Sequence, residues 1–235
     1  MKRTLIITVI SLFLFSLFSF GTKERWDANK TNWSDLMLAV HGGDIGKVKQ
    51  LITEGADINY LINDGYYAYN AIIVGVKTEN YEIVKLLINN GADIKSTYNG
   101  DTLLMIASGY KNTDIIKILL KHGLDVNAHK KNGYTPLKAA VGSGSVQVMQ
   151  ILIDNGADVN YQNGGTALMF AAMDGNLEKI KVLLKAGAIK NIKTEGSGTA
   201  YNYNERAMEY TDSETEIKNR KIIRELLKTN DNSGN

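Results

Sequence analysis

The chain contains no cysteine, a single proline and only three histidines among its 235 residues. Without cysteine it can form no disulfide, no thiolate nucleophile, no cysteine-based zinc site and no lipid anchor attached through sulfur. Three histidines provide little material for a metal centre. These absences turn attention away from metal and thiol chemistry and toward the fold itself.

Charge of one sign is also missing. Lys and Arg together number 27 and Asp and Glu 25, so the formal net charge is +2. If the first 21 residues are removed, two of the cations leave with them and the remainder is close to neutral. A neutral chain has no global field that would attract nucleic acid or an anionic membrane. We therefore expect no nucleic-acid partner. From the absence of Cys and the scarcity of His noted above, we also expect no cofactor.

The longest apolar run lies at the N-terminus, in MKRTLIITVISLFLFSLFSFG at 1–21. Lys2 and Arg3 precede an apolar stretch that ends in small residues, Ser19 and Gly21, which is typical of a secretory signal peptide. Cleavage near Gly21 would release the chain into the periplasm or the medium of a bacterium, since a eukaryotic secreted chain of this size usually carries disulfides. An uncleaved N-terminal membrane anchor is the alternative. After cleavage no stable membrane insertion is expected.

One short segment recurs along the chain. GADIN at 55–59 returns as GADIK at 91–95, GLDVN at 123–127, GADVN at 156–160 and GAIKN at 187–191. A polar residue precedes each of these glycines by 21 positions: Ser34, Asn70, Thr102, Thr135 and Thr166. A period of 31 to 36 residues that holds in two registers indicates a repeat architecture.

Within each unit the apolar spacing is helical. In 133–160, one apolar stripe follows Thr135, a Gly/Ser break covers 142–145, and a second stripe begins at Val146. Thr135 suits an N-cap and Pro136 the first helical turn. Gly156 stands where a helix ends in the left-handed conformation. Each unit is therefore predicted to be helix, turn, helix, Gly cap and extended loop.

The chain resembles the ankyrin repeat family. The resemblance rests on NGDTLLMIA at 99–107, NGYTPLKAA at 132–140 and NGGTALMFAA at 163–172, with EIVKLLINNGADI at 82–94 and LEKIKVLLKAGA at 177–188 as second helices. It implies an all-α repeat solenoid of helix-turn-helix pairs joined by β-hairpin-like loops. The histidine that the family places after the motif leucine is replaced here by Met37, Ile73, Met105, Lys138 and Met169. The bracing hydrogen bonds of that histidine cannot be assumed, and we expect the methionines to fill core.

The domain boundaries follow from this register. We expect a signal peptide at 1–21, polar tails at 22–32 and 229–235, and a repeat domain at 33–228. Five repeats are predicted at 33–60, 61–97, 98–130, 131–161 and 162–193. A capping repeat is predicted at 194–228, with its helical start near 205 and a charged outer face.

The resemblance also implies where a partner protein would bind. In this family the hairpin fingers and the inner face of each first helix line a concave groove. Tyrosine is enriched among the positions that map to its exposed surface, and tyrosine is frequent in interface hot spots. The alternative is that these rings pack on the neighbouring finger. Partner contact is predicted for Trp33, His41, Tyr66, Tyr67, Tyr69, Lys77, Tyr98, Asn99, Asp101, Tyr110, Lys131, Asn132, Tyr134, Gln162, Met173 and Asp174.

Signals for catalysis fail on inspection. HGGDIGKV at 41–48 lacks the first glycine and the final Ser or Thr of a phosphate-binding loop. The Gly/Ser loops VGSGSV at 141–146 and EGSGTA at 195–200 form no nucleophile elbow. We therefore expect a monomeric, non-enzymatic protein-binding module. Its partner would be an envelope enzyme that needs an assembly or stability factor, a toxin that needs an immunity protein, or a host protein. A self-associating structural scaffold, or an enzyme or small-ligand receptor that uses the same groove, is the alternative.

The helix-capping glycines give a first prediction. Replacement of Gly123 by Ala would force a Cβ into a left-handed position and should lower the free energy of unfolding by about 1 kcal/mol or more. Urea unfolding followed by circular dichroism measures this change. An unaltered unfolding curve would mean that residue 123 does not adopt the left-handed conformation.

Overall fold

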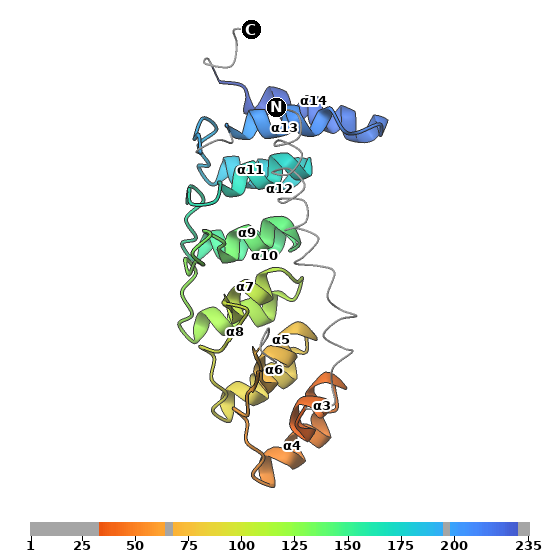
Figure 1. Ribbon diagram of the computed structural model, residues 1–235, viewed down its shortest axis with the longest axis vertical. Helices are drawn as coiled ribbons and strands as arrows, with labels where there is room; N and C mark the ends of the chain where they lie inside the picture. Colours follow the sequence, from red (N-terminus) through yellow and green to blue (C-terminus); the bar gives the residue numbers. More distant parts are fainter. Residues whose placement is uncertain (1–32, 64–67, 195–197, 230–235) are drawn as a thin grey trace.

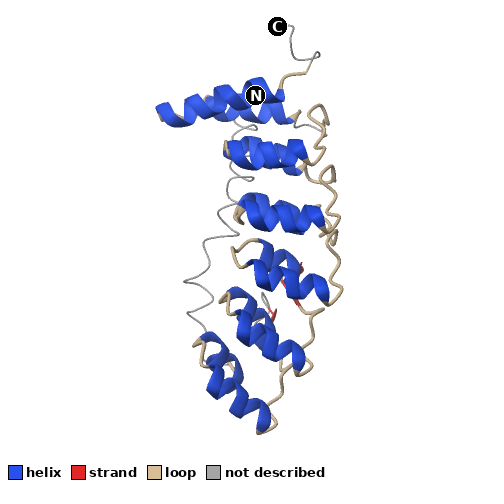
Figure 2. Ribbon diagram, turned by 180° about the vertical axis from the view of Figure 1, so that it is seen from behind, coloured by secondary structure: helices blue, strands red, loops and turns tan. Residues whose placement is uncertain are grey.

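The computed structural model describes residues 33–63, 68–194 and 198–229. Figure 1 shows helix pairs stacked one on another in a single column, with the connecting loops gathered along one edge. Figure 2 shows the same stack from behind, with the few strands confined to those loops. The predicted all-α repeat solenoid is confirmed.

Each repeat contributes two antiparallel helices. The first helices are α3 (Asp35–His41), α5 (Ala71–Lys77), α7 (Leu103–Ser108), α9 (Pro136–Gly142), α11 (Ala167–Asp174) and α13 (Ala200–Met208). The second helices are α4 (Ile45–Thr53), α6 (Tyr81–Asn89), α8 (Thr113–Lys121), α10 (Val146–Asp154), α12 (Leu177–Lys185) and α14 (Glu214–Leu227). None of the helices in these described ranges is long and apolar enough to span a bilayer.

Two of the connecting fingers carry short antiparallel strands. β1 (Ile62–Asn63) pairs with β2 (Ala68–Tyr69), with Ile62 opposite Tyr69. β3 (Thr97–Tyr98) pairs with β4 (Asp101–Thr102), with Tyr98 opposite Asp101. A hairpin of two-residue strands is marginal on its own, so the fingers depend on their neighbours in the stack.

The recurring polar residues are the N-caps of the first helices. The side chains of Ser34, Asn70, Thr102, Thr135 and Thr166 each accept a hydrogen bond from the backbone N–H three residues later. Thr199 does the same for α13, so the capping repeat begins at Ala200. The prediction of a helical start near 205 is wrong, because the N-cap recurs 33 residues after Thr166 and fixes the register earlier.

The core lies between the two helix layers and continues from each repeat into the next. Leu36, Ile72, Leu104, Leu137 and Leu168 repeat at one position of the first helices and are all buried. Full burial of such a side chain contributes about 1.5–3 kcal/mol. Met37, Met105 and Met169 are 0%, 2% and 2% exposed, which confirms that they fill core.

The glycine caps behave as predicted. Gly55, Gly91, Gly123, Gly156 and Gly187 have φ between 81° and 87°. No atom lies within 4 Å of the position that a Cβ would take at any of them. The requirement for glycine at these caps is therefore one of backbone conformation and not of space.

A ladder of asparagines joins successive loops on the exposed edge. Asn127 donates from Nδ2 to the carbonyl of Gly156 (2.9 Å) and accepts from the N–H of Asp158 (2.8 Å). Asn59 and Asn160 make the same pair of bonds to the repeats that follow them. Lys95 occupies the equivalent position after the second repeat and cannot accept a hydrogen bond. The ladder is therefore broken between the second and third repeats.

The capping repeat is locked by a buried cation. The guanidinium of Arg220 donates to the carbonyls of Ala172 (3.1 Å) and Met173 (2.9 Å) at the end of α11. It also pairs with Glu216 one turn earlier, at 2.8 Å. A cation at a helix C-terminus satisfies unpaired carbonyls and opposes the helix dipole. The opposite side of α14 carries exposed Lys218, Lys221 and Glu225, as the prediction of a charged outer face requires.

The broken ladder gives a second prediction. Lys95→Asn should raise the free energy of unfolding by about 0.5–1.5 kcal/mol, because two inter-repeat hydrogen bonds can form. Asn127→Ala, which removes the matching pair of bonds, should lower it by a similar amount. Urea unfolding of both variants beside the unaltered chain tests the pair. A Lys95→Asn protein no more stable than the original would show that the seam between the second and third repeats is spaced differently.

Candidate functional site

The candidate site is the inner face, which we define as the fingers together with the exposed positions of the first helices. The predicted residues divide by exposure. Trp33, Tyr69, Lys77 and Tyr98 are buried, with exposed fractions of 8%, 6%, 9% and 9%. His41, Asp101, Tyr110, Tyr134 and Met173 are half-buried, and Asn99, Lys131, Asn132, Gln162 and Asp174 are exposed. Tyr66 and Tyr67 lie outside the described residues.

Three of the buried aromatic residues form a stack across successive repeats. The ring centroids of Trp33 and Tyr69 are 6.0 Å apart, and those of Tyr69 and Tyr98 are 5.2 Å apart. The two tyrosine hydroxyls are within 3.4 Å of each other. Such tilted ring pairs contribute about 0.5–1.5 kcal/mol beyond burial. The prediction that these positions are exposed is wrong, because the three rings pack on one another and on His41 and Lys77, and the packing alternative is favoured for them.

Lys77 is buried against the same stack. Its ammonium lies 3.5 Å from the centroid of the Tyr98 ring, a cation–π contact. Burial lowers the pKa of Lys77 to about 8, although the nearby charge of Asp101 raises it in part. Lys77 was also expected to be exposed, and that expectation is wrong for the same reason. His41, one repeat earlier, packs its ring against Trp33 at 5.5 Å.

We number each finger by the repeat whose first helix follows it, so the third finger is 97–102, the fourth 130–135 and the fifth 162–166. An ion pair between Asp101 and Lys130 joins the third finger to the fourth. The Lys130 ammonium pairs with the Asp101 carboxylate at 3.1 Å and donates to the carbonyl of Asn99 at 2.9 Å. Burial raises the pKa of Asp101, and the charges of Lys130 and Lys77 oppose that rise. The charged groups of Asp101, Lys130 and Lys77 in the middle of the inner face therefore interact with one another.

The fourth and fifth fingers touch backbone to backbone. A Cβ at Gly133 would lie 2.0 Å from the carbonyl oxygen of Asn163, and one at Gly164 would lie 2.2 Å from that of Asn132. Only glycine permits this approach. The Asn163 side chain also donates to the carbonyl of Lys131 at 3.2 Å. The exposed tips of these two fingers are consequently held in fixed positions.

Lys138 replaces the missing histidine as the brace between the same two fingers. Its ammonium donates to the carbonyls of Gly133 (2.8 Å) and Asn163 (2.6 Å), and it lies 4.9 Å from the Tyr161 ring centroid. Burial lowers the pKa of Lys138 to about 8, with a partial opposing contribution from Asp158. This role was missed from the sequence, although a lysine in a register that is otherwise apolar was the available signal.

Glu79 was missed as well. It adopts φ of 57° in the turn between α5 and α6, which is uncommon for a residue with a side chain. Its carboxylate accepts hydrogen bonds from the N–H groups of Lys111 and Asn112, both at 3.1 Å. The adjacent Tyr110 has its pKa raised to about 12 by burial and by the charge of Glu79. Glu79 thereby fixes the turn that presents Tyr110.

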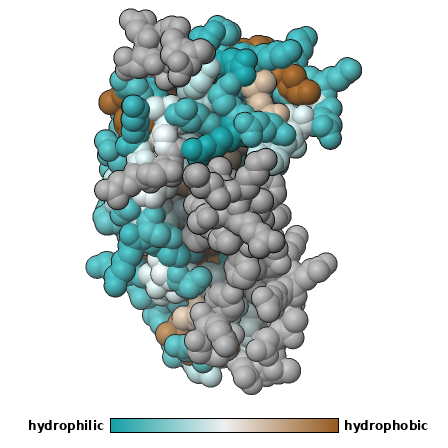
Figure 3. Space-filling view, turned by 45° about the horizontal axis from the view of Figure 1, so that its top comes forward, coloured by the Kyte–Doolittle hydropathy of each residue, from teal (hydrophilic) through white to brown (hydrophobic). Residues whose placement is uncertain are grey.

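On the face that Figure 3 shows, the visible surface of the described residues is mostly hydrophilic, and its apolar spots are small. Within the ranges that the structure describes, no three His, Asp or Glu side chains come close enough together to hold a metal ion. The inner face offers paired charges, exposed amides and aromatic edges. That chemistry suits contact with another macromolecular surface better than bond making.

A third prediction concerns the Lys138 brace. Its folded pKa, about 8, is below its ordinary value of 10.5. Between these values the unfolded chain binds more protons, so the free energy of unfolding should rise with pH. Met stands at this register in three other repeats, so Lys138→Met is the reference variant. The free energy of unfolding of the unaltered chain should increase relative to that of Lys138→Met from pH 8 to pH 10.

Urea unfolding at pH 7, 8, 9 and 10 measures that difference. Lys121→Met, which removes an exposed lysine on α8 and keeps Lys138, serves as the control, and its free energy of unfolding should rise with pH as that of the unaltered chain does. A difference between the unaltered chain and Lys138→Met that stays constant over this range would contradict a lowered pKa for Lys138.

Comparison with known proteins adds one finding. A family model described as "Ankyrin repeats (3 copies)" matches the chain in four overlapping stretches, at residues 13–98, 36–130, 76–163 and 127–194. No curated protein matches the chain. The four stretches together run from 13 to 194 and include the described residues of the first five helix pairs.

Proposed function

This chain belongs to the ankyrin repeat family, and from that premise we propose that it is an exported, non-enzymatic module that binds one partner protein on its inner face. Ankyrin repeats indicate a protein–protein interaction module. Export, the position of the binding face and the absence of catalysis are the parts that we add.

One observation supports the inner face above all: its fingers are held in place, yet the side chains of Asn99, Lys131 and Gln162 at their tips make no hydrogen bond or ion pair with the described residues. Asn99, Lys131, Asn132 and Gln162 are exposed on three successive fingers. The backbone beneath them is held by Lys130, by Lys138 and by the glycine contacts between fingers. A finger whose backbone is already fixed loses little backbone entropy on binding, which favours affinity.

The class of partner follows from the predicted signal peptide at 1–21, which lies outside the described residues. In a bacterial periplasm the partner would be an envelope enzyme that needs an assembly or stability factor, or a toxin held by its immunity protein. If the chain leaves the cell, the partner would be a host protein. In each case the chain acts as a monomer, and an uncleaved N-terminal anchor would tether the same module to the membrane.

The fourth prediction concerns which protein the chain captures in a crosslinking pull-down in the native host. The full chain, expressed with its signal peptide, should capture one envelope or secreted protein that mass spectrometry identifies. Lys131→Glu combined with Gln162→Glu should reduce that capture about tenfold or more, because a loss of 1.4 kcal/mol in binding is already tenfold. The matched control, Lys121→Glu with Gln147→Glu, changes exposed residues on the outer helices α8 and α10 and should capture normally.

Equal capture by the two variants would place the partner on the outer helices or the tails and would overturn the inner face as the site. Capture lost only in the outer variant would overturn it more directly. A specific partner recovered from the cytoplasm alone would contradict export while leaving the binding module intact.

A further inference from the structure

Asparagine stands directly before glycine at five places, all within the described ranges: Asn90–Gly91, Asn99–Gly100, Asn132–Gly133, Asn155–Gly156 and Asn163–Gly164. At such a pair the asparagine side chain can lose ammonia without an enzyme. The backbone nitrogen of the glycine attacks Cγ of the asparagine, and glycine has no Cβ to obstruct the approach. A hydrogen bond that holds either group opposes the attack, because it must break first. The five pairs therefore differ in reactivity according to their hydrogen bonds.

Hydrogen bonds restrain the two pairs at the ends of α6 and α10. The side chains of Asn90 and Asn155 each donate from Nδ2 to the carbonyl four residues earlier, at 2.8 Å. The N–H groups of Gly91 and Gly156 donate to carbonyls of the same helices, at 3.1 Å and 3.0 Å. Both reacting groups are thus held at each of these pairs.

The pairs on the fourth and fifth fingers are restrained as well. Oδ1 of Asn132 accepts from the N–H of Tyr134 at 3.2 Å, and the N–H of Gly133 donates across the same turn at 2.8 Å. Nδ2 of Asn163 donates to the carbonyl of Lys131 at 3.2 Å. The close backbone approach between these two fingers restrains both turns further.

The pair at the tip of the third finger is different. Asn99 and Gly100 are both exposed, and neither the Asn99 carboxamide nor the Gly100 N–H makes a hydrogen bond within the part of the chain that the structure describes. Their φ values, 52° and 76°, suit a two-residue type I′ turn. This turn joins strands of only two residues each, which are marginal on their own. It can therefore open locally without the unfolding of a helix.

We propose that Asn99 is a site of spontaneous deamidation, which converts the tip of the third finger to aspartate and isoaspartate. The Gly100 nitrogen bonds to Cγ of Asn99, the C–N bond of the carboxamide breaks, and ammonia leaves with the proton that the glycine nitrogen gives up. One water molecule then opens the resulting succinimide ring. Opening at the side-chain carbonyl gives aspartate. Opening at the backbone carbonyl gives isoaspartate, in which the main chain runs through Cβ and Cγ.

Either product changes the inner face beside Lys130. That ammonium donates to the backbone carbonyl of Asn99 at 2.9 Å and pairs with Asp101 at 3.1 Å. In isoaspartate the same carbonyl oxygen becomes part of a free carboxylate, so an ion pair can replace a neutral acceptor. Isoaspartate also lengthens the turn by one backbone carbon, and turn length sets the pairing register of a hairpin. The third finger thereby gains a negative charge and, as isoaspartate, loses its type I′ geometry.

The test is to hold the purified full chain at pH 8 for several weeks and to digest samples with trypsin. Cleavage after Lys95 and Lys111 gives peptide 96–111, in which Asn99 is the only asparagine, and cleavage after Lys131 and Lys138 gives peptide 132–138, in which Asn132 is the only one. Mass spectrometry measures the deamidated fraction, and fragmentation separates aspartate from isoaspartate. Peptide 96–111 should deamidate about tenfold faster or more, because the Asn132 pair must first break two hydrogen bonds.

Two controls accompany this measurement. In guanidinium chloride the hydrogen bonds are lost, and the two peptides should deamidate at similar rates. Asn99→Gln keeps a carboxamide at the finger tip but cannot close the five-membered ring, so peptide 96–111 of that variant should remain unreacted. A sample digested at the start measures the deamidation that digestion itself causes.

Equal rates for the two peptides in the folded chain, or a faster reaction in 132–138, would overturn the assignment of Asn99. A difference that guanidinium chloride leaves unchanged would also overturn it, because neighbouring residues and not the finger would then select the site. The reaction needs no partner, so its outcome is independent of the pull-down that tests the proposed function.

Discussion

Each helix pair in this protein has an apolar face that it cannot bury alone. The helices of the first five pairs have six to nine residues, which is too short for stability in water by themselves. The leucine and isoleucine side chains of one pair are covered only when the next pair packs against them. The free energy of unfolding of such a stack is close to the sum of the intrinsic stabilities of the repeats and the interface energies between neighbouring repeats. Every other feature of the molecule is arranged around these repeated interfaces, including the ends, where no neighbour is available.

The polar groups at each seam are satisfied by different means. Asparagine bridges loops at three seams and lysine interrupts the pattern at one. Glu79 joins the turns of the second and third repeats, Lys138 joins the fourth and fifth fingers, and Arg220 fastens the capping repeat to α11. Buried cations such as Lys138 and Arg220 are tolerated because main-chain carbonyls surround them. The seams are therefore chemically unequal, although the helices that they join are similar.

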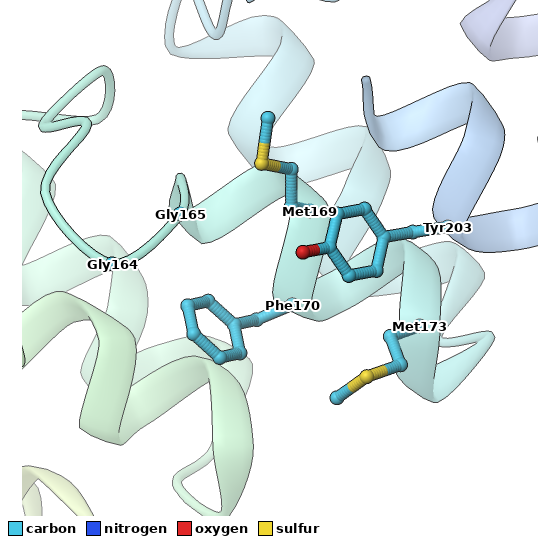
Figure 4. A pocket seen from close by; sticks show the side chains of 6 residues that line it. All are labelled: Gly164, Gly165, Met169, Phe170, Met173 and Tyr203. Carbon is cyan, nitrogen blue, oxygen red and sulfur yellow. The ribbon is translucent and has the colours of Figure 1, made fainter. Parts of the chain in front are cut away.

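The inner face likewise differs between its N-terminal and C-terminal parts. Toward the N-terminus, Trp33, Tyr69 and Tyr98 are used to stack the fingers, and Lys77 is buried on top of them. Toward the C-terminus, Phe170, Met173 and Tyr203 line a small pocket between α11 and α13 (Figure 4). Aromatic residues thus lie at both ends of the face, buried at one end and half-buried at the other. Composition alone does not distinguish a ring that stiffens a finger from one that a partner could reach.

The sequence by itself determined the repeat register, the N-caps, the left-handed glycines and the core methionines. Each of these is a local property, set by the backbone geometry of a single turn or by the period of one helix. Only the tertiary structure decided that Trp33, Tyr69, Lys77 and Tyr98 are buried, and that Lys138 and Glu79 connect different repeats. These facts depend on contacts between residues from 21 positions apart (Lys77 and Tyr98) to 36 positions apart (Trp33 and Tyr69). The distance between two fingers is fixed by the packing of the helices beneath them. A pattern within one repeat carries no information about that distance.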